Sequence, residues 1–400
     1  MSAHTDSAIR PAPLHGMRVL DLTRLLPGPL ATQHLADYGA EVIKVEDTGA
    51  GDYARTMGAM NGDTSYFYQV VNRNKRSLRL DLKQPEGRAL FLRLVETADV
   101  VVEGFRPGVM DKLGLGYEVL AAANPAIVCC SISGYGQSGP YSQRAGHDIN
   151  YIGYAGVLDM IGERGRGPVV PGVQIGDIGG GGLMAAVGIL AALAEREKTG
   201  RGRFVDISMT DGAFSWMSIH GQAFAMTGEV PRRGAMRLAG EFACYHVYRC
   251  ADERWVTVGA LEPQFWEALC QALGVPEMIE RQFSPPEEQD LMIARLAEIF
   301  ATRTRDAWVA DLADLDACFG PVKDMEEAFA DEQLLARGMV VEAPTPEGTV
   351  HAIGNPVHLV GDERPSPRPA PDFGEHTDDV LRAAGYDDAR IEQLRATRAI

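Results

Sequence analysis

The first half of the chain alternates short, continuously apolar segments with amphipathic ones, a pattern typical of a parallel sheet covered by helices. Residues 17–22 and 41–46 (MRVLDL and EVIKVE) predict two strands, with a helix over residues 31–39 between them. The same alternation continues, with further strands predicted over residues 77–82, 98–104 and 126–133 and helices over residues 85–96 and up to Ala123. We therefore expect an α/β fold built from βαβ units.

The second half departs from this pattern after a glycine-rich segment. Residues 176–182 predict tight backbone turns, because glycine tolerates a positive φ, and residues 183–198 predict a long helix. A helical, methionine-rich stretch follows and breaks at Pro231, and residues 243–259 predict a hairpin. Residues after 340 are rich in proline and charge, as in an extended arm with one short terminal helix. We accordingly divide the chain into residues 1–205, a linker helix over 206–235, a smaller α+β domain over 236–330, and a C-terminal part over 331–400.

The composition is that of an ordinary globular protein, with 46% hydrophobic and 23% charged residues. Its net charge of −17 disfavours binding to nucleic acid and to anionic membrane surfaces. No uncharged apolar stretch reaches the roughly 18 residues of a membrane span, and residues 1–12 lack the pattern of a signal peptide. We therefore expect a cytoplasmic protein that binds neither membrane nor nucleic acid.

The cysteines and glycines do not indicate a permanently bound cofactor. The six cysteines form no CxxC pair and no His/Cys cluster has ligand spacing, so we expect reduced thiols and no metal site. A GxGxxG match at Gly134, Gly136 and Gly139 is followed by Pro140 rather than by an amphipathic helix. The match therefore predicts a turn and not a dinucleotide site.

Basic residues gather in one segment of this acidic protein, RNKRSLRLDLK, which holds Arg73, Lys75, Arg76, Arg79 and Lys83. Such a cluster suits a phosphorylated ligand. A solvated strand face with surface ion pairs is the equal alternative. Arg106 and Lys112 follow the next predicted strand, where ligands of parallel sheets gather, and they favour the anion site.

Two residues are candidates for proton transfer. His147 begins an apolar element in AGHDINY, and Asp177 precedes the glycine run and the long helix. A lone histidine is usually structural, and Asp177 has the position of a helix N-cap. Inverting a carbon next to a thioester needs one acid/base group on each face and donors for the enolate oxygen. His147 and Asp177 are of the right types, and their spacing in the sequence does not by itself bring them together.

Several segments identify a family. The motifs RVLDLTRLLPGPLATQHLADYGAEVIKVE, RNKRSLRLDLK, VVEGFRPGV and GILAALAEREKTGRGRFVDISMTDG resemble the class III CoA-transferase superfamily over nearly the whole chain. GHDINY from Gly146, GDIGGGG from Gly176 and GALEPQFW from Gly259 are similar to the α-methylacyl-CoA racemases within it. The transferases usually lack the histidine and carry a glycine-rich loop where this chain reads RLAGEFACYHVY.

The resemblance implies a racemase or epimerase that inverts the α-carbon of 2-methylacyl-CoA thioesters through an enolate. It makes His147 and Asp177 the proton-transfer residues, with Asp148 and Glu262 as supporting groups. Coenzyme A, as part of the substrate, would contact Asp81, Leu82, Lys83, Gln84, Phe105, Arg106, Pro107, Lys112, Gly146, Ile149, Asn150 and Tyr151. The alternatives are a CoA-transferase that uses Asp177 as a nucleophile and a non-catalytic acyl-CoA-binding protein.

The resemblance also implies an interlocked homodimer, in which a Rossmann-like large domain is built from both chain ends. One position departs from the racemase pattern. Racemases often carry an arginine shortly after the second strand as a partner of the CoA phosphates, and this chain has Asp47 there. Arg55 or the cations at 73–79 are the candidates to replace it.

Overall fold

The computed structural model describes residues 12–345, 347–359 and 367–400. The start of the chain, where we expect no signal peptide, therefore lies outside the described residues. So do residues 360–366 of the proline-rich C-terminal part. The chain divides into two compact units. Unit 1 comprises the chain up to Ala155, Pro171–Met217 and Ala336–Ile400, and unit 2 comprises Gly156–Val170 and Ser218–Leu335.

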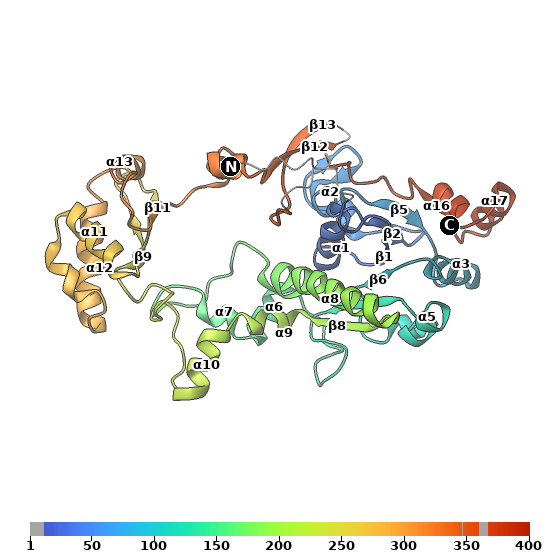
Figure 1. Cartoon of the computed structure of the whole chain (residues 1–400), viewed down its shortest axis with the longest axis horizontal. Coiled ribbons are helices and arrows are strands. Elements are labelled where there is room, and N and C mark those ends of the chain that lie inside the picture. The colour runs from blue at the N-terminus through green and yellow to red at the C-terminus, as the bar shows by residue number, and fades with distance from the viewer. Residues whose placement is uncertain (1–11, 346, 360–366) are drawn as a thin grey trace, which may run out of the picture. The chain divides into compact units, whose positions relative to one another are not determined.

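A six-stranded parallel sheet forms the centre of unit 1 (Figure 1). Its strands are β1 (Arg18–Asp21), β2 (Glu41–Glu46), β5 (Arg76–Arg79), β6 (Val100–Glu103), β7 (Val128–Ser133) and β8 (Phe204–Ser208). They lie in the order β5-β2-β1-β6-β7-β8, which is the order of a doubly wound sheet. The order reverses between β1 and β6, and sheets of this kind bind their ligands outside the carboxyl ends of the strands at that point. The expected α/β fold with a parallel sheet is thus confirmed.

Helices cover both faces of this sheet because alternate strand residues point to opposite sides. Val19 and Val42 pack on one face beneath α1 (Pro27–Asp37) and α8 (Met184–Thr199). Leu20 and Ile43 pack on the other. The further helical elements of unit 1 are η1 (Tyr53–Thr56), α2 (Tyr66–Asn72), α3 (Pro85–Val95), α4 (Val109–Lys112), α5 (Tyr117–Ala123), α6 (Asp148–Tyr154), η2 (Ile175–Leu183), α9 (Met209–Ser215), α16 (Thr377–Ala383) and α17 (Asp388–Ala396).

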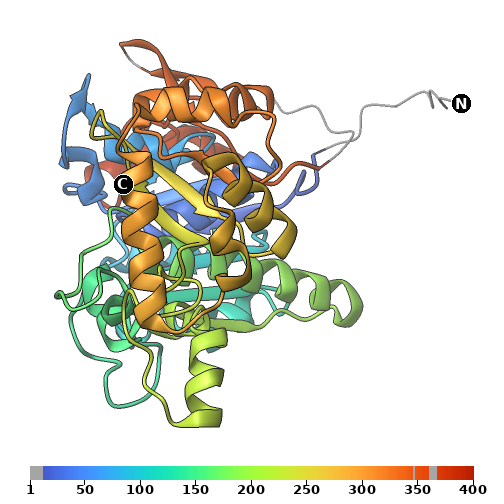
Figure 2. The ribbon, with the colours of Figure 1, turned by 90° about the vertical axis from the view of Figure 1, so that its left-hand side faces the viewer.

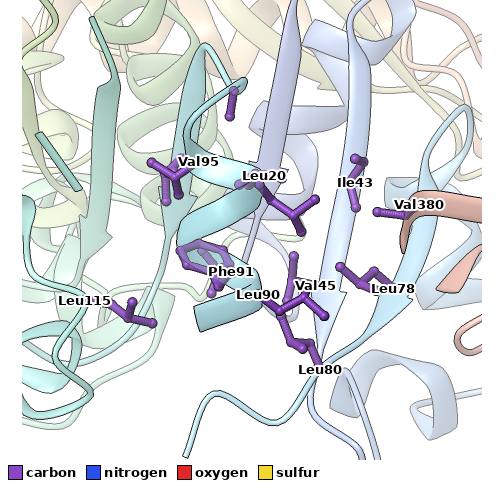
Figure 3. Packing of buried hydrophobic residues seen from close by; sticks show 14 of the residues in the cluster. Leu20, Ile43, Val45, Leu78, Leu80, Leu90, Phe91, Val95, Leu115 and Val380 are labelled. Atoms are coloured by element: carbon purple, nitrogen blue, oxygen red, sulfur yellow. The ribbon is translucent and has the colours of Figure 1, made fainter. Parts of the chain in front are cut away.

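Residues from the far end of the chain complete the second core. Figure 3 shows Val380 of α16 next to Leu78 and Ile43, with Leu90 and Phe91 of α3 beyond them. The same cluster includes Ile391 and Leu394 of α17 and the last two residues of the chain. The predicted arm with one terminal helix is therefore wrong in part, because two helices pack here and an antiparallel hairpin, β12 (Val340–Thr345) and β13 (Gly348–Ile353), precedes them.

Unit 2 combines a small antiparallel sheet with helices. Its strands β9 (Tyr245–Arg249), β10 (Trp255–Gly259) and β11 (Phe319–Pro321) lie in the order β11-β10-β9. Figure 2 shows the helices of this unit beside its yellow strands, and the two share one hydrophobic core. The helices are α7 (Val157–Met160), α10 (Ser218–Thr227), α11 (Pro263–Leu273), η3 (Pro276–Arg281), α12 (Pro286–Phe300), α13 (Arg305–Asp311), α14 (Met325–Phe329) and α15 (Glu332–Ala336).

One segment lies in a different unit from the one expected. Residues 156–170 fall within the range 1–205 that the sequence assigns to the large domain, but they belong to unit 2. Arg233 explains this placement, because its guanidinium donates to the carbonyl oxygens of Asp159 (2.9 Å) and Arg166 (3.2 Å). These contacts join stretches of sequence that hydrophobic periodicity does not connect.

Within the part of the chain that the structure describes, one helical stretch, Ile175–Thr199, is long and apolar enough to cross a membrane by length and composition. A helix in a protein core meets the same criteria. This one packs against α1, β7 and β8 of unit 1.

Candidate active site

Asp177 lies in an unusual helical segment. Residues Ile175–Leu183 form a π-helical stretch, η2, that continues directly into α8. None of its glycines has a positive φ, and Gln174, not Asp177, occupies the N-cap position. The predicted tight turns and the predicted N-cap role of Asp177 are therefore wrong. The glycines serve close packing instead of unusual dihedral angles.

The close packing can be measured by placing a Cβ atom on each glycine. A Cβ on Gly180 would lie 2.5 Å from the carbonyl oxygen of Met209 and 2.8 Å from the amide nitrogen of Ala213. A Cβ on Gly179 would lie 2.0 Å from the ring of Trp216. Backbone atoms of α9 occupy the space that a side chain at Gly180 would need. The contact with α9 therefore fixes the position of the Asp177 segment on that side.

Asp148 links this segment to α6. Its carboxylate oxygen Oδ1 accepts a hydrogen bond of 2.9 Å from the backbone N–H of Asp177. Gly176 allows the approach, because a Cβ there would lie 3.1 Å from the same oxygen. Asp148 is the residue after His147, so the structure brings the chain segments of the two predicted proton-transfer residues together.

The carboxyl group of Asp177 is half-buried, and its surroundings change its acidity. Burial, and after it the neighbouring charge of Asp148, raises the pKa of Asp177 to about 7. Both factors disfavour a second negative charge in a poorly solvated place. A carboxyl group with this pKa can both release and accept a proton near neutral pH.

His147 is held differently. It is exposed and occupies the N-cap position of α6, where its backbone N–H donates to Oδ1 of Asn150 (3.0 Å). Tyr151 is buried, and its hydroxyl donates to the carbonyl oxygen of Gly146 (2.5 Å). Ile149 is exposed. The GHDINY segment is thus fixed by its own side chains and leaves the imidazole of His147 open to solvent.

The remaining predicted CoA contacts follow β5 and β6. Residues 81–84 form a turn, in which Oδ1 of Asp81 accepts from the N–H of Lys83 (2.9 Å) and the amide of Gln84 donates to the carbonyl of Arg398 (3.0 Å). Leu82 and Phe105 pack at the edge of the core. The carbonyl of Pro107 accepts from Gln143 (3.1 Å).

Three exposed cations stand at these positions without internal partners. The side chains of Lys83, Arg106 and Lys112 have neither a hydrogen bond nor an ion pair with any residue in the described ranges. The sheet presents such groups at its carboxyl edge, where they can bind phosphate without first breaking another contact.

The other cations of the basic segment are occupied. Arg73 pairs with Asp37 (2.7 Å), Lys75 with Asp21 (3.0 Å) and Arg76 with Glu41 (2.7 Å). The hypothesis that residues 73–76 bind an anion is therefore contradicted. Sequence composition could not distinguish an anion site from a set of internal ion pairs, because the acidic partners come from distant segments.

The two candidates for the missing arginine are also occupied. Arg55 is buried against Glu46 at 2.6 Å and packs on the ring of Tyr68. Asp47 itself pairs with Arg24 at 2.7 Å. Arg79 donates to the carbonyl of Thr48 (3.2 Å) and lies over the ring of Phe373.

Glu103 is a polar residue of this edge that the sequence reasoning missed. It ends β6, and its Oε2 accepts from the backbone N–H of Phe105 (2.7 Å), which fixes the turn before Arg106. Burial raises the pKa of Glu103 to about 7. It lines a cavity of about 230 Å³ with Arg106, Tyr117 and Phe204. The sequence feature that could have identified Glu103 is an acidic residue at the end of a strand that is otherwise wholly apolar.

Glu262 belongs to unit 2, where it is the N-cap residue of α11. It is therefore not among the residues of unit 1 that surround Asp177. No group of three or more His, Cys, Asp or Glu side chains that could hold a metal ion occurs among the described residues.

Comparisons with known proteins point to one family. The CoA-transferase family III model matches residues 14–377. Human alpha-methylacyl-CoA racemase is 37% identical over 393 residues, which are 97% of each chain. Human succinyl-CoA:glutarate CoA-transferase is 35% identical over 390 residues, 96% of this chain and 88% of that protein. A CAIB/BAIF family protein from Brucella suis superposes with a TM-score of 0.83 and 32% identity, covering 94% of this chain and 100% of that one.

Proposed function

Because this chain belongs to CoA-transferase family III, we propose that it is a racemase that inverts the α-carbon of 2-methylacyl-CoA thioesters. The family contains racemases and CoA-transferases of similar identity to this chain, so the choice between them depends on the site. The observation that carries the proposal is the hydrogen bond from the Asp177 N–H to Asp148, which joins the segment of Asp177 to that of His147.

The proposed reaction moves one proton on each face of the α-carbon. The Asp177 carboxylate takes the α-proton of one enantiomer, and the electron pair of the C–H bond moves to the thioester carbonyl oxygen. Protonated His147 then gives its proton to the opposite face of the enolate, and the carbonyl re-forms. The other enantiomer reacts in reverse, with neutral His147 as the base and protonated Asp177 as the acid.

The acidity of Asp177 suits this double role. Its pKa of about 7 means that both protonation states are populated near neutral pH, so neither direction requires a rare form of the enzyme. A nucleophilic carboxylate, by contrast, gains nothing from being half protonated. This feature favours proton transfer over acyl transfer.

We assign coenzyme A binding to the edge that carries Lys83, Arg106 and Lys112. These cations suit the diphosphate and the 3′-phosphate of the coenzyme, because each can form a charge-assisted hydrogen bond without giving up an internal partner. Phe105 and Leu82, half-buried beside them, offer an apolar surface for the adenine ring. The GHDINY segment would then guide the thioester toward Asp177.

We further propose that the enzyme acts as a cytoplasmic homodimer. The helix α10 supports an interface, because it exposes Ile219 (66%) and Met226 (77%) and buries none of its residues. Sedimentation at micromolar concentration should give twice the chain mass of 43.3 kDa.

The decisive experiment incubates each enantiomer of a 2-methylacyl-CoA with the protein in deuterated water. A racemase incorporates α-deuterium while optical purity is lost, and both signals vanish in a His147→Ala, Asp177→Ala variant. If neither signal appears but CoA passes to an added carboxylic acid, and His147→Gln leaves that transfer intact, Asp177 is a nucleophile and the protein is a CoA-transferase. Binding without either reaction would leave an acyl-CoA-binding protein.

A further inference from the structure

Residues 23–29, which run from the connection after β1 into the first turn of α1 and are called the Thr23–Pro29 loop below, are held by two lysines that are completely buried. Lys44 of β2 donates from Nζ to the carbonyl oxygen of Thr23 (2.9 Å), and Lys75 donates to the carbonyl oxygen of Pro29 (2.8 Å). Each lysine pairs with a buried aspartate, Lys44 with Asp52 at 2.8 Å and Lys75 with Asp21 at 3.0 Å, and all four side chains have no exposed surface. The two ion pairs thus hold the first and the last residue of this short segment by hydrogen bonds to its carbonyl oxygens.

The aspartates bind the same loop through its amides. Oδ1 of Asp52 accepts from the N–H of Leu25 (3.0 Å), and Oδ1 of Asp21 accepts from the N–H of Thr23 (2.9 Å). Leu25 has a φ of 64°, a left-handed conformation that is unfavourable for a residue with a branched side chain. The hydrogen bond that Leu25 donates to Asp52 therefore stabilises a backbone conformation that the sequence alone would not favour.

Stability gives no simple reason for these four charges. Removing charged groups from water costs about as much as their attraction returns, and apolar side chains of similar size often stabilise a core equally well. Burial lowers the pKa of Lys75 to about 8 despite the attraction of the neighbouring Asp21. Such pairs are best explained where they fix a geometry that apolar contacts would leave variable.

The loop that they fix lies directly against the segment of Asp177. A Cβ on Gly182 would lie 2.8 Å from the carbonyl oxygen of Pro27, and a Cβ on Gly181 would lie 3.1 Å from the Cβ of Pro27. Helix α9 supports the segment on another side, so the segment is in contact with both elements. All of these residues belong to unit 1.

We propose that Lys44 and Asp52 are positioning residues for Asp177, acting through the Thr23–Pro29 loop and the glycine segment. The proposal rests on the racemase function proposed above, and it assigns a role in the reaction to a buried ion pair that does not touch the substrate. It predicts that the pair matters for the proton transfer of Asp177 and much less for that of His147.

The test uses the double variant Lys44→Met, Asp52→Asn. Both charges are removed together, so no unpaired charge stays buried. The new asparagine side chain retains an oxygen for the N–H of Leu25, while the bond to the carbonyl of Thr23 is lost. The matched control is Arg196→Met, Asp99→Asn, which removes the 2.8 Å ion pair at the other end of the helix that continues from the Asp177 segment.

The measured quantity is the rate of α-deuterium exchange into each enantiomer separately. With Asp177→Asn, exchange should persist only in the enantiomer that His147 deprotonates, and His147→Ala should give the opposite pattern. The Lys44→Met, Asp52→Asn variant should lose exchange by about tenfold or more in the enantiomer that Asp177 deprotonates, because a displacement of about 1 Å at a reacting group costs up to about 100-fold. Exchange into the other enantiomer should fall less than about threefold.

Each outcome decides the question. Equal losses in both enantiomers, or rates matching those of the control pair, would overturn the positioning role. A loss confined to the enantiomer of His147 would overturn it as well. If the double variant does not fold, Asp52→Ala removes the acceptor for the N–H of Leu25, leaves Lys44 beside Asp21 and must show the same asymmetry in weaker form. An unaltered protein that exchanges neither enantiomer contradicts the racemase function itself, and the inference with it.

Discussion

The two segments that carry His147 and Asp177 differ in how they are held. The segment of Asp177 lies against backbone atoms of α9 and of the Thr23–Pro29 loop, so it has almost no freedom to shift. The segment of His147 is held mainly by side chains, and the ring of Tyr135 lies 5.3 Å from that of the buried Tyr151 and 5.4 Å from that of the exposed Tyr154. One proposed base is thus rigidly held and the other is more adjustable.

The difference suggests a division of labour. A carboxyl group whose pKa depends on burial needs a constant environment, because small shifts would admit water and change its acidity. An exposed imidazole, by contrast, can follow acyl groups of different shape. Four changes test whether this difference is real.

The largest loss of stability is expected from a methyl group in the rigid segment. Gly180→Ala places a Cβ 2.5 Å from the carbonyl oxygen of Met209. Either the segment moves to relieve this clash, or the protein loses about 1–3 kcal/mol of stability. Racemisation should fall by about 100-fold. Gly153→Ala in α6 is the matched control, because a Cβ there meets no atom within 4 Å. It should gain up to about 1 kcal/mol, and comparable losses in both variants would refute the contrast.

Asp177→Asn should stabilise the protein while abolishing racemisation. The pKa of Asp177 is raised to about 7 in the folded state, so its ionisation disfavours folding. This cost is absent below pH 4, grows as the pH rises toward 7 and is complete above it. Thermal unfolding at pH 8 should therefore show a gain of about 1–3 kcal/mol, the lower figure allowing for partial exposure. No gain should remain at pH 4, and a constant gain across pH would contradict the raised pKa.

Asp148→Asn should shift the pH profile without destroying the site. The asparagine oxygen can still accept from the N–H of Asp177, but the charge that helps to raise the pKa of Asp177 is gone. The acidic limb of kcat/KM, for the enantiomer that Asp177 deprotonates, should therefore move to lower pH. Burial keeps it above the range of an ordinary aspartate. An unchanged limb would show that the charge of Asp148 does not reach Asp177.

The smallest effect is expected from Tyr154→Phe. It removes the 2.6 Å hydrogen bond from Arg144 on the exposed side of the His147 segment. Exposed contacts of this kind contribute at most about 1 kcal/mol, so racemisation should stay within about twofold of the unaltered rate. A tenfold loss in steady-state assays would show that the His147 segment is as sensitive to its surroundings as that of Asp177.

Hydrophobic pattern revealed the strands and their parallel arrangement, because buried parallel strands such as Glu41–Glu46 are marked by unbroken apolar sequence. It could not reveal how the glycines of residues 176–182 are used. Glycine permits both a positive φ and the approach of another backbone, and only the position of α9 decides between them. The neighbour that requires the glycine is more than 25 residues away in the sequence.

The sequence alone is equally unable to show which cations are free to bind a ligand. Arg73, Lys75 and Arg76 look like a phosphate site until Asp37, Asp21 and Glu41 are seen to pair with them across the fold. The chemistry of a cation is written in the sequence, but its availability depends on tertiary contacts. His147 and Asp177 were found by motif alone, and their roles stay a prediction that the exchange experiment tests.

The discontinuous course of unit 1 has a consequence for biosynthesis. Ile391, Leu394 and the residues after them complete the core that Leu78 and Leu90 begin, so a nascent chain carries an open sheet until its last helices leave the ribosome. Unit 2, complete by Leu335, can collapse during translation, while unit 1 must wait. During that interval the apolar face of β2 and β5 stays uncovered.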